Sequence, residues 1–191
     1  QNVYGKRSGA VAANIDGLER DMSFTISEDC EIEPILGESE QGLYILRHSC
    51  AHLLAQAVVE IFPDAKPTIG PPIEHGFYYD FHMNPIGDAD LKKIEKRMQQ
   101  LVRENIKIHR EEYENSELRE MFQGNKFKIE IMDDKIGNEV GSTAYRQGDF
   151  VDLCRGPHVP STSHLRWFKL TSTSQAYWRA DRNREPLTRI Y

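Results

Sequence analysis

The sequence is poor in cysteine and has no long apolar run. Three cysteines occur in 191 residues, Cys30, Cys50 and Cys154, at unrelated spacings. An odd, sparse set of this kind argues against a disulfide framework and suits a reducing compartment. No stretch of about 18 apolar residues is present, and the first residues lack the charged-then-apolar order of a signal peptide. These absences argue against a membrane span and against export, and we expect a cytoplasmic protein.

The sequence also lacks an excess of basic residues. Its 24 Lys and Arg stand against 30 Asp and Glu, which gives a formal net charge of −6. Indiscriminate binding to nucleic acids requires basic residues that displace counterions, so any such contact must be local. The segment from Arg155 onward is nevertheless basic and carries interleaved aromatic residues. This mixture can hold phosphates and stack on bases, although a solvated charged face is the commoner explanation.

Internal repeats and low-complexity segments are missing as well, and the 39% of apolar residues is enough for one sizeable domain, alone or with a small appendage. Residues 1–38 are β-rich, with predicted strands at 10–15, 18–26 and 31–35 and a turn at Asp16-Gly17. This segment is too short to bury a core of its own, so we expect the C-terminal part of a larger β-rich module. Residues 37–42, polar with glycine at both ends, predict a domain boundary, and residues 43–191 form the second domain.

Two helices are predicted with different surroundings. Residues 43–62 are apolar almost all round, with a narrow polar stripe through Ser49, Gln56 and Glu60, which indicates a central, mostly buried helix. Asp88 can cap a second helix whose apolar residues fall on one face, as expected for a surface helix over a sheet. Ser116 can cap a third, short helix that ends near Gln123.

The remaining segments alternate with the period of strands. Strands are predicted at 76–81, 127–132, 143–146, 150–154, 167–170 and 176–179, with a loop at 138–142. In this scheme Lys128 lies on the polar face of its strand, while Asp152 and Cys154 share one face. Because no regular βαβ rhythm occurs, we predict an α+β fold, in which an antiparallel sheet packs around the central buried helix, with the further helix on the surface.

Two histidines stand out on the central helix. His48 and His52 are four residues apart and therefore lie on the same helix face, together with Ile45, Ala55 and Val59. That face looks toward a core or a pocket. A histidine on an apolar face is, taken alone, more often a structural core residue than a functional one.

A second pair of chemically active residues occurs about a hundred residues later. Cys154 and His158 flank a predicted strand-to-turn corner, and Asp152 precedes them. Three imidazoles and one thiolate form a complete tetrahedral set for zinc. However, the close Cys-x-x-Cys spacing of zinc fingers is missing, and no glutamate follows His48 as in zinc proteases. A metal site and a metal-free polar pocket stay equally open, and a cysteine hydrolase is a weaker third alternative.

Four blocks of sequence carry a family resemblance. They are Arg47-His48-Ser49-Cys50-Ala51-His52-Leu53-Leu54, Ile69-Gly70-Pro71-Pro72-Ile73 continuing into Gly76-Phe77-Tyr78-Tyr79-Asp80, Asp152-Leu153-Cys154-Arg155-Gly156-Pro157-His158, and Tyr177-Trp178 through Arg189-Ile190-Tyr191. In order and spacing, residues 43–191 resemble the amino-terminal editing domain of threonyl-tRNA synthetase, and residues 1–38 resemble the end of the ubiquitin-like domain before it. Alanyl-tRNA editing proteins share the two-pair pattern. In the threonyl family the synthetic core follows Tyr191, and this sequence does not contain it.

The resemblance implies an aminoacyl-tRNA ester hydrolase that performs post-transfer editing. Serine lacks one methyl group of threonine, which is worth only about 1 to 3 kcal/mol in a binding pocket, so a second site is needed to remove serine. The implied partner is the acceptor end of tRNA(Thr) carrying serine, with no membrane involved, and the full-length enzyme would be a homodimer through the absent core. No cofactor is expected for editing. Zinc on His48, His52, Cys154 and His158 is the weaker alternative, and ATP and zinc would belong to the absent core.

The resemblance also implies roles for individual residues. His48, with His52 beside it, would relay a proton to water or to the ribose hydroxyl, His158 would hold a second water, and Cys154 would line the pocket floor. Asp152 would bind the seryl ammonium, Lys128 would meet the ester or the terminal ribose, and Tyr79 would stack or hydrogen-bond near the adenosine.

Considered without the resemblance, these residues could equally have ordinary structural roles. Lys128 reads as a solvent-facing residue and Tyr79 as a core aromatic, while Asp152 is as readily a surface partner for Arg155. For the whole chain, two other functions remain open: a module that binds the tRNA acceptor arm without activity of its own, and a zinc-stabilised structural domain.

Overall fold

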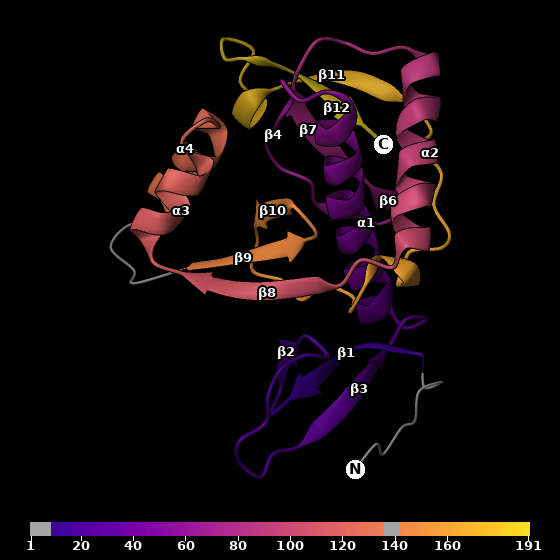
Figure 1. The fold of residues 1–191 in the computed structure, drawn as a ribbon, viewed down its shortest axis with the longest axis vertical. Coiled ribbons are helices and arrows are strands. Elements are labelled where there is room, and N and C mark those ends of the chain that lie inside the picture. The colour runs from indigo at the N-terminus through magenta and orange to yellow at the C-terminus, as the bar shows by residue number, and fades with distance from the viewer. Residues whose placement is uncertain (1–8, 136–141) are drawn as a thin grey trace.

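The computed structural model describes residues 9–135 and 142–191. A long helix, α1 (Glu40–Ile61), runs through the middle of the molecule, and the strands are arranged around it (Figure 1). The other helices are α2 (Asp88–Glu104), α3 (Asn115–Phe122) and α4 (Lys126–Lys135). Within the part of the chain that is described, no helix is both long and apolar enough to cross a membrane.

Twelve short strands form four antiparallel sheets within the described ranges. The sheet orders are β2-β1-β3, β10-β9-β8, β11-β12-β7-β4 and β5-β6. The strand bounds are β1 (Ala10–Ile15), β2 (Leu18–Arg20), β3 (Ile32–Leu36), β4 (Lys66–Pro67), β5 (Pro72–Ile73), β6 (Gly76–Phe77), β7 (Tyr79–His82), β8 (Ile108–Tyr113), β9 (Ser142–Gln147), β10 (Phe150–Leu153), β11 (Thr173–Tyr177) and β12 (Pro186–Ile190). The α+β prediction is confirmed, although the strands are divided among several sheets and do not form one.

Helix α1 (Glu40–Ile61) is buried along most of its length, as predicted. It begins earlier than expected because the Ser39 hydroxyl accepts a hydrogen bond from the Gly42 amide at 3.0 Å and so caps the helix. Gly42 lies against the backbone of Leu36, where a Cβ atom would clash. The polar, glycine-bounded segment 37–42 therefore contains the first turn of α1.

The β2-β1-β3 sheet packs against α1 and does not stand apart from it. Val11, Ala12 and Ile35 belong to the same core cluster as the buried residues of α1 and α2. This shared core explains how a segment of fewer than 40 residues stays folded. The predicted strand 18–26 ends at Arg20, because the chain turns at Asp21, whose carbonyl accepts from the Phe24 amide at 3.0 Å.

The prediction of a strand at 127–132 was wrong, because these residues lie in α4. Phe127 and Ile131 pack with Trp178, while Ile129 and Met132 pack with Leu118 on another side of the helix. A helix buried on two sides shows apolar residues at alternating positions, which imitates a strand. The Asn125 side chain accepts from the amides of Phe127 and Lys128 and identifies the true start of the helix.

Smaller corrections concern element ends. The predicted strand at 76–81 is divided into β6 and β7, and residues 167–170 lie in no strand. The residue that caps α2 is Gly87 and not Asp88, and the residue that caps α3 is Glu114 and not Ser116. The predicted strand 176–179 ends at Tyr177, where a 3-10 turn (Trp178–Ala180) begins. Most of the predicted loop 138–142 lies outside the described residues, and Ser142 already belongs to β9.

Candidate functional site

The structure brings the two predicted pairs together. His48 and His52 come from α1, while Cys154 and His158 follow β10. The Cys154 Sγ atom lies 3.3 Å from Nε2 of His48 and 3.3 Å from Nε2 of His158. The His158 ring is 4.3 Å from that of His48 and 4.2 Å from that of His52, measured between centroids. We call these four residues the His/Cys cluster.

Ser49 fixes the orientation of one imidazole in this cluster. Its hydroxyl is fully buried, accepts from the Val159 amide at 3.1 Å and lies 3.0 Å from Nδ1 of His158. Since the hydroxyl needs an acceptor for its own proton, it donates to Nδ1. His158 then carries its proton on Nε2, directed at the sulfur of Cys154.

The sulfur of Cys154 has three polar neighbours. The Gly156 amide donates to it at 3.3 Å, in addition to Nε2–H of His158. Nε2 of His48 lies 3.3 Å from the same sulfur atom.

Burial keeps these groups neutral. Loss of hydration lowers the pKa of His48 to about 4 and that of His52 to about 3, in spite of the opposing charge of Asp152. The pKa of His158 is also held well below its ordinary value, first by burial and then by the neighbouring histidines. Burial raises the pKa of the Cys154 thiol to about 12, although the Gly156 amide opposes this shift. A neutral thiol is a poor nucleophile, which disfavours the cysteine-hydrolase alternative.

A second group, formed by Lys128, Asp152 and Tyr79, lies beside the His/Cys cluster. The Lys128 ammonium is 2.5 Å from Oδ1 of Asp152, and the Tyr79 hydroxyl donates to Oδ2 at 2.6 Å. Lys128 also donates to the Tyr79 hydroxyl at 3.1 Å. All three side chains are buried, so neither the solvent-facing alternative for Lys128 nor the surface pair of Asp152 with Arg155 applies.

Asp152 connects the two groups. Its Oδ2 atom lies 3.8 Å from Nε2 of His52. Burial acts to raise the pKa of this carboxyl, but the charge of Lys128 and hydrogen bonds from Lys128 and Tyr79 outweigh it and hold the pKa below 3.8. The site therefore combines neutral imidazoles and a neutral thiol with one buried ion pair.

Tyr79 takes part in the site through its hydroxyl. Its ring is only 1% exposed, stacks on Phe81 with centroids 4.9 Å apart, and approaches Gly70 so closely that a Cβ there would clash. This packing leaves the hydroxyl, and not the ring, available to the site.

The donor atoms of the His/Cys cluster lie close enough together that they could hold a metal ion. The four atoms all lie within 4.8 Å of one another. Ligand atoms around tetrahedral zinc are about 3.4 to 3.7 Å apart, and the two sulfur–nitrogen distances of 3.3 Å are close to this range. These residues could hold zinc if the thiol of Cys154 and Nε2 of His158 both gave up their protons, and a zinc ion with four protein ligands would be structural in character.

Sequence reasoning missed three residues that support the site: Ser49, Tyr145 and Asp21. Ser49 was assigned to a polar stripe, yet its place one residue after His48, on a helix apolar all round, is a signal that its hydroxyl must have a buried partner. Asp21 accepts from the His158 amide at 2.8 Å and from the Tyr145 hydroxyl at 2.6 Å. No sequence pattern links positions 21 and 158.

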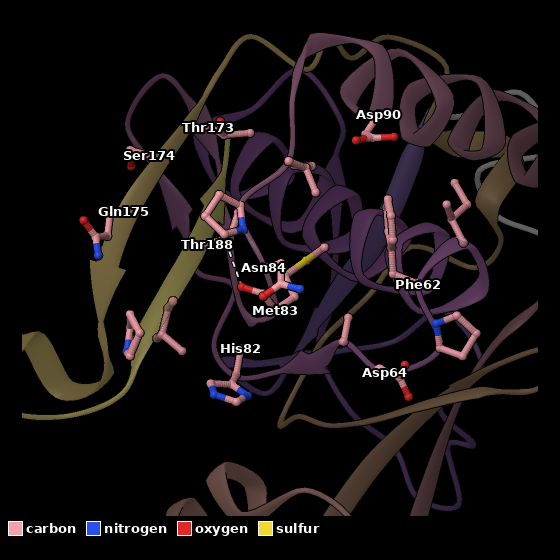
Figure 2. Close-up of a pocket in the computed structure, with 17 residues that line it drawn as sticks. Phe62, Asp64, His82, Met83, Asn84, Asp90, Thr173, Ser174, Gln175 and Thr188 are labelled. Carbon is pink, nitrogen blue, oxygen red and sulfur yellow. Dashed lines mark hydrogen bonds between the residues drawn. The ribbon is translucent and has the colours of Figure 1, made fainter.

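A large cavity lies elsewhere in the molecule. It has a volume of about 960 Å³ and opens between the end of α1, the loop after β7 and strands β11 and β12 (Figure 2). Thr188 donates to the carbonyl of Met83 at its wall. Neither the residues of the His/Cys cluster nor Lys128, Asp152 and Tyr79 line this cavity, so the candidate chemistry is not located there.

Comparisons with known proteins agree with the resemblance seen in the sequence. Residues 143–191 match the family described as the threonyl and alanyl tRNA synthetase second additional domain. The chain is 46% identical over 183 residues to threonine–tRNA ligase of Rubrobacter xylanophilus, which covers 95% of this chain and 28% of that protein. It is 46% identical over 186 residues to the same enzyme of Thermoplasma acidophilum, which covers 97% of this chain and 28% of that protein. It is 48% identical over 190 residues to the enzyme of Aromatoleum aromaticum, which covers 98% of this chain and 30% of that protein.

The chain therefore spans only about three tenths of the length of these relatives. The similarity nevertheless extends over nearly all of the chain, including the β2-β1-β3 sheet that precedes α1. Over nearly its whole length the chain is thus similar to threonine–tRNA ligases, and residues 143–191 match the threonyl and alanyl tRNA synthetase second additional domain.

Proposed function

We propose that this chain hydrolyses the ester bond between serine and tRNA(Thr), as the post-transfer editing domain of a threonine–tRNA ligase. The observation that carries the proposal is the convergence of three neutral imidazoles on one face of a site whose other side holds a buried Lys128–Asp152 pair. This arrangement supplies proton acceptors and a positive charge within one small volume, as ester hydrolysis by water requires.

His48 is the proposed proton relay. His52 and His158 are buried, whereas His48 is only partly buried and is therefore the imidazole that a water molecule can reach. Its lowered pKa keeps it unprotonated at neutral pH, so that it can accept a proton. Cys154 and His52 flank this ring and set its position, with the His48 and His52 rings 5.2 Å apart and nearly perpendicular.

The reaction would proceed by attack of water on the ester carbonyl carbon. His48 takes one proton from the attacking water, and a tetrahedral oxyanion forms. When the bond to the ribose oxygen breaks, the leaving oxygen receives the proton that His48 took from the water, and free serine and intact tRNA result. Lys128 provides the positive charge that stabilises the developing oxyanion or the ribose oxygen.

Asp152 is the proposed site for the seryl ammonium. Its carboxylate accepts from Lys128, from Tyr79 and from the Leu153 amide, the last at 2.8 Å. A carboxylate has about four acceptor positions, so one remains, on the Oδ2 atom that faces His52. In this proposal both ring nitrogens of His158 keep their protein partners, Ser49 and Cys154, and no metal ion takes part.

A serine-release assay tests the proposal. The chain is incubated with tRNA(Thr) carrying labelled serine, and we expect release faster than the uncatalysed rate, with loss of this acceleration in His48→Ala. His75→Ala is the matched control, because His75 lies at the surface, with 87% of its side chain exposed. If wild type and His48→Ala are equally inert while tRNA still binds, the chain is a binding module and the proposed hydrolysis is wrong.

A further inference from the structure

Asp21, in the turn that follows β2, reaches across to the candidate site. Its two carboxylate oxygens have different partners, both far away in sequence. Oδ1 accepts from the His158 backbone amide at 2.8 Å, and Oδ2 accepts from the Tyr145 hydroxyl at 2.6 Å. One carboxylate of the N-terminal sheet thus holds two parts of the second domain.

Tyr145 transmits this contact to the corner that carries Cys154 and His158. Its ring packs edge-on against the His158 ring, with centroids 4.4 Å apart, and is itself 2% exposed. Its hydroxyl fills the space beside Gly156 where a Cβ atom would otherwise lie. Residues 156–158 are therefore enclosed by Tyr145 on one side and by Asp21 on another.

His158 is consequently fixed at two points by different elements. Ser49 of α1 orients the ring through Nδ1, and Asp21 holds the backbone amide. With its backbone and its ring both held, His158 presents Nε2 to Cys154 at 3.3 Å. Hydrogen bonds of this supporting kind fix the orientation of site residues, and their loss typically lowers activity by about 10- to 100-fold.

We infer that Asp21 is a positioning residue of the editing site, and that the N-terminal sheet is in this way a working part of that site. The inference rests on the proposed hydrolysis of seryl-tRNA, and it adds a residue outside the region that matches the second additional domain. Asp21 touches no substrate in this account, and it acts through His158 and Tyr145.

The test compares Asp21→Ala, Asp21→Asn and Tyr145→Phe with the control Asp29→Asn. Asp29 is an exposed carboxylate of the same unit. We expect kcat for serine release to fall about 10- to 100-fold in Asp21→Ala, with KM changed less than about threefold. Asp21→Asn keeps an acceptor for the His158 amide and should recover part of the rate, and Tyr145→Phe, which keeps that amide bond, should also retain more activity than Asp21→Ala. Asp29→Asn should match wild type.

A second readout does not depend on catalysis. In hydrogen exchange, the His158 amide should exchange faster in Asp21→Ala than in wild type, under conditions where amides of α2 are unchanged. If wild type releases no serine, the proposed function fails, but faster exchange at His158 still confirms that Asp21 holds this corner. If Asp21→Ala leaves both kcat and the His158 exchange rate at wild-type values, Asp21 does not position the site.

Discussion

The Lys128 ammonium lies 2.5 Å from Oδ1 of Asp152, and both side chains are at most 4% exposed. A buried ion pair of this kind makes each charge dependent on the other, because either one alone would remain without a partner in a medium of low polarity. The pair joins α4 to β10 and thereby fixes the wall of the site that faces His52.

Removal of Lys128 should therefore cost much stability as well as activity. We expect Lys128→Met to lower the free energy of unfolding by about 3 to 5 kcal/mol, measured by urea denaturation. The double variant Lys128→Met with Asp152→Asn should regain at least half of this loss but stay inactive in serine release. Lys126→Met is the control, because Lys126 pairs with Glu185 at the surface and should change stability by only about 0 to 1 kcal/mol. Equal losses in the two single variants would contradict a special role for the buried pair.

Stability should fall in mild acid because of the buried histidines. The unfolded chain binds protons at histidine near pH 6.5, whereas His48 and His52 in the folded chain bind them only near pH 4 and 3. Above about pH 6.5 neither state binds these protons, and the free energy of unfolding is not reduced. As the pH falls from 6.5 toward 4, the unfolded chain binds them first, and the free energy of unfolding decreases by up to about 1.4 kcal/mol per pH unit for each histidine. Asp152, with its pKa below 3.8, adds a loss only at lower pH.

Denaturant titrations between pH 7.5 and 4.5 measure this slope. The variant His52→Gln, which cannot bind a proton, should show a shallower decrease than wild type over the same range. A wild-type stability that stays constant from pH 7 to 5 would contradict the neutral, buried state assigned to these rings.

The rate of serine release should be nearly independent of pH around neutrality. If neutral His48 is the proton acceptor, kcat/KM should decrease only as His48 becomes protonated, with a midpoint near its pKa of about 4. An ordinary histidine would give a midpoint near 6.5. The assay measures initial rates from pH 5 to 8 after subtraction of the uncatalysed rate, and a midpoint above 6 would contradict the assignment.

Removal of metal should leave the activity intact. We expect serine release by the chain to be unchanged after treatment with a chelator, and elemental analysis of the purified chain to give less than stoichiometric zinc. Added zinc should inhibit, since binding at the His/Cys cluster would occupy the nitrogen of His48 that accepts the proton. Loss of activity on chelation with recovery on addition of zinc would show instead that the cluster is a metal site.

Gly156 offers a test of how tightly the corner before His158 is packed. An alanine Cβ at this position would clash with the Tyr145 hydroxyl, and the backbone has φ of +73°, which L-residues rarely adopt. We expect Gly156→Ala to destabilise the chain by about 2 kcal/mol or more. Gly124→Ala, where a Cβ meets nothing within 4 Å, is the control and should be nearly neutral. Thermal melts of both variants and of Gly156→Ala with Tyr145→Phe measure the effect, and the double variant should recover part of the loss.

The sequence was most informative where a local pattern decides the structure. The apolar residues around α1 predicted a central helix, and the i, i+4 spacing placed His48 and His52 on one face of it. The prediction from the sequence failed at α4, because burial on two sides gives this helix the apolar alternation of a strand. Lys128 was therefore placed on an exposed strand face. The contacts of Asp21 could not be predicted, since they depend on how the N-terminal sheet packs against α1.

The hydrogen bonds of His158 connect positions that are 109 residues apart, for Ser49, and 137 apart, for Asp21. Closing loops of this length costs chain entropy, and this cost is offset only by long-range contacts, which form late in folding. A growing polypeptide acquires the helix with His48 and His52 early, but it has no complete site until residue 158 has been synthesised and has reached both partners. Proton-transfer chemistry at this site would thus begin only when residues 21, 49 and 158 have come together.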